Sequence, residues 1–150
     1  MSLDWTDYSA QFEDQGTLRN IIVLGTTVGD WQKMFDWIRT SEYPLEYLKD
    51  GEPADFPGTV QEAFATVGED TYSYSFDVDG LPVHGMVYSE RFAEEIEMDI
   101  EPVMVTNQDE FDHLIALMQN LSNELKKPVM LTHEMNRDEV ILELEPEAGD

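Results

Sequence analysis

Two stretches of the chain share one pattern of hydrophobic positions, which predicts a strand, a helix and a strand in that order. The first begins with the apolar run 21–24, and the second with apolar residues at 98, 100, 103 and 105. The helix positions of the first stretch are Trp31, Met34, Phe35 and Ile38, and those of the second are Phe111, Leu114, Ile115, Leu117 and Met118. The runs Tyr43-Pro44-Leu45 and Pro128-Val129-Met130-Leu131 close the two units, which repeat after about 80 residues.

A capping signal marks the start of each predicted helix. Thr27 with Asp30 three residues later has the form of a capping box, and Thr106 with Asp109 has the same form. Aligning the two units on these caps shifts them by one residue from the hydrophobic alignment, in which Trp31 matches Phe111. The strand-helix-strand pattern of the two units is therefore better defined than the residue-by-residue alignment between them.

Residues 71–88 carry the clearest hairpin pattern in the chain. Aromatic and aliphatic residues alternate with polar ones on both sides of Asp79-Gly80, the preferred pair for a two-residue type I′ turn. This turn predicts four cross-strand pairs on one apolar face: Val78 with Leu81, Phe76 with Val83, Tyr74 with Gly85, and Tyr72 with Val87. We expect an aromatic ring to lie over the glycine.

Residues 95–101 alternate strictly between apolar and acidic side chains. Ile96, Met98 and Ile100 point one way in a strand, so their acidic neighbours form a ladder with a spacing of about 6.6 to 6.8 Å. The members of this ladder are Glu95, Glu97, Asp99 and Glu101. The last predicted strand, 139–145, should place Val140, Leu142 and Leu144 inside, and Ile141, Glu143 and Glu145 outside.

These elements predict an α+β fold in one domain, 1–150, with a mainly antiparallel sheet and two β-α-β units flanking a β-hairpin. The helices at 30–40 and 107–126 each have one apolar stripe, so we expect both on the same face of the sheet. The arrangement predicts a ferredoxin-like variant, with a cystatin-like sheet as the alternative. An N-terminal helical segment, 1–16, should cover one end of the core, and 146–150 should form an acidic tail.

The charge of the chain narrows the choice of partners. It has 33 acidic and 8 basic residues, a formal net charge of −25. Such a charge repels phosphate backbones and anionic lipids, so we expect no nucleic acid or membrane partner. Three interpretations compete: a surface matched to a basic protein, an adaptation to a saline cytoplasm, and plain solubility.

The chain has no cysteine, which excludes thiol catalysis, disulfides and cysteine-bound metals. Its first residues lack the features of a signal peptide, and no apolar run approaches about 18 residues, so we expect a cytoplasmic protein.

No motif predicts a catalytic residue, a metal site or a cofactor. The loop 25–29 lacks the Gly-Lys-Ser/Thr ending of a phosphate loop, and Asp30 would repel an anion. Glu110 and His113 have the spacing of one di-iron ligand pair, but the four-helix core of such sites is missing. Asp77-Val78-Asp79-Gly80 is similar to the start of a calcium loop without its later ligands, and the hairpin turn explains it better.

Only one place brings a histidine beside a hydroxyl. His84 lies opposite Ser75 on the polar face of the hairpin, with Asp77 diagonal to both. A nucleophile needs a base that a third group orients, so these residues define the alternative hypothesis of a small-molecule or hydrolase pocket near His84. No Gly-x-Ser-x-Gly elbow accompanies them.

Two short motifs resemble small, functionally uncharacterised bacterial proteins: Thr17-Leu18-Arg19-Asn20-Ile21-Ile22-Val23-Leu24 and Asp30-Trp31-Gln32. The resemblance spans most of the domain and implies no activity and no site residues.

We therefore expect a small acidic, non-catalytic protein-binding or accessory module, with an immunity-like or inhibitor-like protein as one concrete form. The expected binding surface consists of the ladder residues with Glu143 and Glu145, and the expected partner is a protein, in one version a basic one. Exposed edge strands also allow a homodimer.

Overall fold

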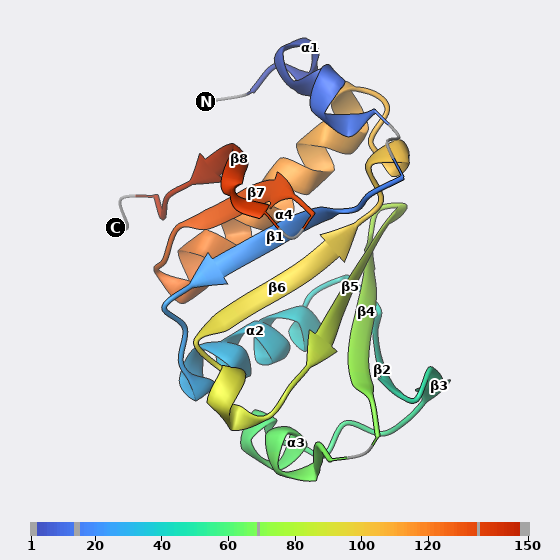
Figure 1. The fold of residues 1–150 in the computed structure, drawn as a ribbon, viewed down its shortest axis with the longest axis vertical. Coiled ribbons are helices and arrows are strands. Elements are labelled where there is room, and N and C mark those ends of the chain that lie inside the picture. Colours follow the sequence, from blue (N-terminus) through green and yellow to red (C-terminus); the bar gives the residue numbers. More distant parts are fainter. Residues whose placement is uncertain (1–2, 14–15, 69, 135, 148–150) are drawn as a thin grey trace.

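The computed structural model describes residues 3–13, 16–68, 70–134 and 136–147. Its strands form one antiparallel sheet in the order β3-β2-β4-β5-β6-β1-β7-β8 (Figure 1). The strands are β1 (Arg19–Leu24), β2 (Leu45–Lys49), β3 (Glu52–Pro53), β4 (Tyr72–Val78), β5 (Leu81–Val87), β6 (Glu95–Ile100), β7 (Val129–His133) and β8 (Asn136–Leu144). The α+β fold class and the antiparallel sheet are confirmed.

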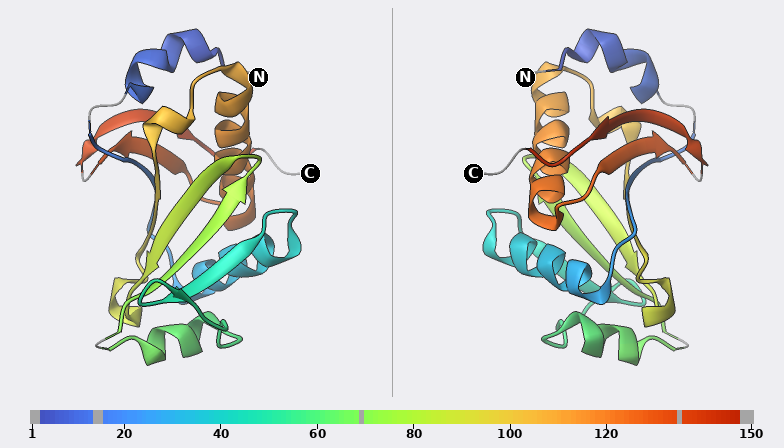
Figure 2. Two further views of the ribbon diagram at one scale, coloured as in Figure 1. Left: turned by 90° about the vertical axis from the view of Figure 1, so that its right-hand side faces the viewer. Right: turned by 90° about the vertical axis from the view of Figure 1, so that its left-hand side faces the viewer.

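Two long helices, α2 (Val28–Thr40) and α4 (Gln108–Leu125), lie on one face of the sheet (Figure 2). Each turns its apolar stripe toward the strands, so that Trp31, Phe35, Phe111 and Leu114 are buried. The shorter elements are α1 (Trp5–Tyr8), α3 (Val60–Thr66), and the 3-10 helices η1 (Ser9–Phe12), η2 (Glu90–Phe92) and η3 (Pro102–Met104). The core therefore lies between the sheet and the helix layer.

The two β-α-β units differ in how they enter the sheet. In the second unit β6 and β7 flank a single strand, β1, whereas in the first unit three strands, β4, β5 and β6, separate β1 from β2. The similar sequence patterns thus give similar elements but different neighbours. The central order is β5-β6-β1-β7, extended by β4, β2 and β3 at one edge and by β8 at the other. The ferredoxin-like and cystatin-like descriptions stay predictions.

Both long helices begin at a side-chain cap. The capping box of Thr27 and Asp30 is confirmed, since the hydroxyl of Thr27 accepts from the Asp30 amide and the Asp30 carboxylate accepts from the Thr27 amide. The predicted cap Thr106 is wrong, because Asn107 accepts from the Glu110 amide at 2.9 Å. Asn107 follows Thr27 by the same interval as Phe111 follows Trp31, so caps and hydrophobic positions share one alignment.

The central hairpin has the predicted turn and register. Asp79 and Gly80 both have positive φ, 51° and 98°, as a type I′ turn requires. All four predicted pairs are present, including Tyr74 opposite Gly85. The fully buried ring of Tyr74 lies against Gly85, where a side chain would occupy the same space.

The prediction that Val140 points inside is wrong. Leu131 pairs with Leu142, but the next residue of β7, Thr132, pairs with Val140, so Ile141 is an extra residue in β8. This bulge changes the direction of the strand's side chains. Val140 is 45% exposed, whereas Ile141 packs against the core.

The N-terminal segment closes one end of the core, as a short helix followed by a 3-10 turn. Trp5, Tyr8 and Phe12 surround the ring of Phe111 at centroid distances of 5.4 to 5.9 Å. The buried Arg19 side chain ties η1 to β1, because its Nε donates to the Gln11 carbonyl at 2.7 Å.

The predicted acidic tail lies partly outside the described residues, since 148–150 are not among them. Within the described part, the Glu147 amide donates to the Asn123 side chain of α4 at 2.8 Å.

We expect Gly85→Ala to lower the free energy of unfolding by about 1–3 kcal/mol, because the new Cβ would lie 2.7 Å from Cε1 of Tyr74, and a buried ring has no space to move. Urea unfolding measures the change. The matched control is Gly29→Ala in α2, whose Cβ would meet only Thr27 Oγ1 at 3.5 Å and should leave stability equal or higher. Equal losses in the two variants would contradict the packing argument.

Candidate functional site

The uncovered face of the sheet carries the first part of the predicted ladder. Ile96, Met98 and Ile100 of β6 are buried toward the helices, and the alternate positions Glu95, Glu97 and Asp99 are half-buried on the opposite face. We call these three carboxylates and the sheet surface around them the acidic face. The alternation of β6 has thus placed the three side chains together on one surface.

The remaining predicted members lie outside β6, and Glu101 lines the same hollow as Asp99. Glu101 is exposed just after the end of β6. Glu143 shares the cross-strand row of Glu97, with Ile22 and Met130 between them. Glu145 follows the end of β8, and its carbonyl accepts from Gln119 Nε2 of α4 at 2.9 Å, which ties its backbone to the helix layer.

The middle of the uncovered face is buried rather than flat and exposed. Asn20, Ile22 and Thr132 point to this side and are each at most 2% exposed. In Figure 2, η2 projects on the side opposite α2 and α4. Hollows of about 690 and 400 Å³ are lined in part by the carboxylates of this face.

Asp99 lies at the centre of this hollowed surface. Its Oδ1 accepts from Asn20 Nδ2 at 2.6 Å, and it pairs in register with His84 on the other side. Burial raises the pKa of the Asp99 carboxyl; His84 lowers this pKa, Glu134 raises it and the Asn20 hydrogen bond lowers it. The net effect is a raised pKa, because partial burial makes the ionised form of the Asp99 carboxyl less favourable.

The hollow of about 690 Å³ lies at the end of the face where β1 ends and β6 begins. Apolar and acidic side chains line it together: Leu24, Met86, Tyr88, Phe92, Glu94, Glu95 and Glu97. The rings of Tyr88 and Phe92 meet edge-to-face at 5.8 Å, and the guanidinium of Arg91 lies 5.0 Å from the Phe92 centroid. Sequence reasoning missed this site, because 88–92 has neither a strand nor a helix period.

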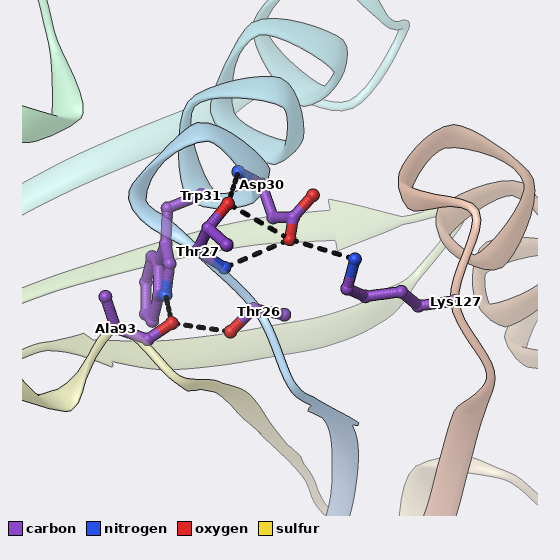
Figure 3. Close-up of polar contacts among 6 residues, drawn as sticks. All are labelled: Thr26, Thr27, Asp30, Trp31, Ala93 and Lys127. Atoms are coloured by element: carbon purple, nitrogen blue, oxygen red, sulfur yellow. Dashed lines mark hydrogen bonds and ion pairs between the residues drawn. The ribbon is translucent and has the colours of Figure 1, made fainter.

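Hydrogen bonds to one carbonyl hold the floor of this hollow (Figure 3). The Ala93 carbonyl accepts from Thr26 Oγ1 at 2.6 Å and from Trp31 Nε1 at 3.1 Å. The Thr26 amide also donates to the Glu94 carbonyl at 3.0 Å. The segment after η2 is thereby joined to the loop between β1 and α2.

The N-terminus of α2 is occupied by the protein's own carboxylate. Asp30 accepts from the Thr27 amide at 3.0 Å and pairs with Lys127 Nζ at 3.3 Å, with the Asp30 side chain 8% exposed (Figure 3). Free N–H groups at the start of α2 are therefore bonded within the protein, as the predicted capping box requires.

The residues of the hydrolase hypothesis are aligned across neighbouring strands of the sheet. Ser75, His84 and Asp99 lie in one row across β4, β5 and β6. Asp77 pairs with Pro82 and is therefore diagonal to His84, as predicted. The smaller hollow, of about 400 Å³, reaches His84 and Asp99, and Ser75 is not among its lining residues. Among the described residues, no hydrogen bond joins His84 to either neighbour, and a triad requires both.

Within the described ranges, no three histidine, aspartate or glutamate side chains are grouped as metal ligands. No helix in the described part of the chain has the length and apolarity to cross a bilayer. Comparisons with models of known protein families, with curated proteins and with solved structures give no match. Function must therefore be argued from the geometry of the site.

We expect Thr26→Val to lower the free energy of unfolding by about 1 kcal/mol, because it removes a buried hydrogen bond to the Ala93 carbonyl at nearly constant side-chain volume. Chemical denaturation measures the effect. Thr71→Val, at an exposed position, is the control and should change stability by less than about 0.5 kcal/mol. The hydrogen-bonded floor would not be stabilising if both variants unfolded alike.

We expect Asp99→Asn to raise the free energy of unfolding at pH 7. A pKa raised in the folded state means that ionised Asp99 opposes folding above that pKa, and the opposition disappears as the pH falls toward the ordinary value of 3.8. The gain should therefore shrink on acidification, while an asparagine oxygen still accepts from Asn20. Unfolding curves between about pH 3.5 and 8 test this.

Asp55→Asn, at an exposed position, is the control for removing one negative charge from a chain of net charge −25. A gain at Asp99 no larger than that at Asp55, or one that grows on acidification, would contradict the burial argument.

Proposed function

We propose that the protein is a non-catalytic binding module that engages a basic protein partner through the acidic face. The observation that carries the proposal is the position of Glu95, Glu97 and Asp99 at alternate residues of a central strand, on the side opposite α2 and α4. Three like charges at a spacing of about 6.6 to 6.8 Å repel one another, and a cationic surface relieves that repulsion.

Electrostatics favours the same kind of partner at long range. A net charge of −25 attracts basic proteins and accelerates their encounter, while the local arrangement of charges decides where they bind. Lysine and arginine side chains on the partner would meet the carboxylates of β6. Neutralisation of a basic toxin or nuclease by an immunity-like or inhibitory module is the concrete form that we favour.

Apolar groups beside the charges support a protein partner over small ions. Leu24, Tyr88 and Phe92 are each about half exposed at the end of the acidic face. Aromatic residues are enriched in the buried centres of interfaces, with charges and polar groups around them. The surface on which these three side chains lie beside the carboxylates has this composition.

The test compares two triple variants with the same change in charge. E95Q/E97Q/D99N removes three charges from the acidic face, and E42Q/E52Q/E124Q removes three exposed charges elsewhere. With a nonalysine peptide as probe, calorimetry in about 50 mM salt should show about tenfold weaker binding for the first variant than for the second. The difference should shrink as salt screens it.

Equal losses in the two triple variants would overturn the proposed function. Equal losses would mean that the peptide binds the negative charge of the whole surface and not the acidic face, as an adaptation to a saline cytoplasm predicts. Circular dichroism and urea unfolding of both variants would show that each is folded under the conditions of the titration.

A further inference from the structure

The hollow beside η2 combines three features that together suit a cationic side chain. The first is space: about 690 Å³ lies in the range of small-ligand pockets and leaves room for a side chain of a partner beside the residues that line it. The second is a pair of aromatic rings, Tyr88 and Phe92, exposed at 45% and 52%. The third is negative charge, since Glu95 and Glu97 line the same hollow.

The aromatic rings lie within the field of the carboxylates. Burial raises the pKa of the Tyr88 hydroxyl, and the neighbouring Glu97, Asp99 and Glu95 raise it further. A negative potential at the ring favours a cation over its face, where the π electrons attract positive charge as well. An apolar ligand would pack on the rings but would gain no binding energy from the negative potential.

The chain itself shows how a cation fits there. The Arg91 guanidinium lies 5.0 Å from the centroid of Phe92, and Arg91 lines the hollow. A planar guanidinium stacks on an aromatic face and forms two parallel hydrogen bonds to a carboxylate, whereas an ammonium is a strongly hydrated point charge. Stacking beside carboxylates therefore selects arginine over lysine.

The floor of the hollow is held in place before a ligand arrives. The Ala93 carbonyl accepts from Thr26 and Trp31, which are buried and belong to the loop after β1 and to α2. A preformed site loses less conformational entropy on binding.

We infer that this hollow is a subsite for one arginine side chain of the basic partner, which stacks on Phe92 and Tyr88 and pairs with Glu95 and Glu97. The inference rests on the proposed function and adds the residue type that the interface recognises. The Arg91 side chain occupies the aromatic surface in the free protein and is displaced by the arginine of the partner.

The test uses two peptides of equal charge, nonalysine and the same peptide with arginine at its central position. Calorimetry should show about three- to fivefold tighter binding of the arginine peptide to the unmodified protein. Phe92→Ala should abolish this preference while leaving nonalysine binding within about twofold. Val103→Ala, at another exposed apolar side chain, should leave the preference intact.

A second pair of variants tests the displacement of Arg91. Arg91→Ala should increase the preference for the arginine peptide, because it removes the internal competitor. Arg39→Ala makes the same change in charge at a guanidinium that stacks on Phe56, away from the hollow, and should not increase it. Nuclear magnetic resonance should also show that the arginine peptide, more than nonalysine, shifts the Trp31 indole N–H signal.

The outcomes separate this inference from the proposed function. If the acidic-face variant weakens nonalysine binding selectively but no arginine preference exists, or the preference survives Phe92→Ala, the arginine subsite is overturned and the binding module stands. If the two triple variants behave alike while Phe92→Ala removes the arginine preference, the proposed function fails, and the arginine stacks on the aromatic rings without the pairing to Glu95 and Glu97.

Discussion

The alternation of apolar and acidic side chains along β6 is the constraint on which the rest of the structure depends. A strand directs successive side chains to opposite faces, so burying Ile96 and Met98 under α2 and α4 places Glu95, Glu97 and Asp99 on the other face. A shift of one residue in register would bury the carboxylates in the core. Because β6 lies between β5 and β1, it also sets which residues of both neighbours face the hollowed side.

The acidic face is held by contacts that come from all sides of the fold. Asn20 of β1 donates to Asp99, and His84 of β5 lies opposite the same carboxylate. Asp30, by contrast, is neutralised locally by Lys127 and its capping bonds. The acid at the start of α2 is thus held by capping bonds and a lysine, whereas β6 places Glu95, Glu97 and Asp99 together on the uncovered face of the sheet.

One carbonyl links the core to the proposed arginine subsite. Ala93 follows η2, and its oxygen binds Thr26 and Trp31, so the aromatic segment 88–92 is anchored by residues far away in the chain. The strand register also bears on the hydrolase alternative. It aligns Ser75, His84 and Asp99 in one row, but alignment of Cα atoms does not orient a nucleophile toward its base.

Local patterns in the sequence by themselves determined the elements: the periods of strands and helices, the Asp79-Gly80 turn with its register, the cap at Thr27, and the carboxylates that share a face of β6. Only the tertiary structure decided the strand order, the bulge that exposes Val140, and the hollow beside Tyr88 and Phe92. The physical reason is the distance along the chain over which each interaction acts. Periodicity and turn chemistry act over a few residues, whereas strand neighbours and hollows depend on which distant surfaces bury one another most completely.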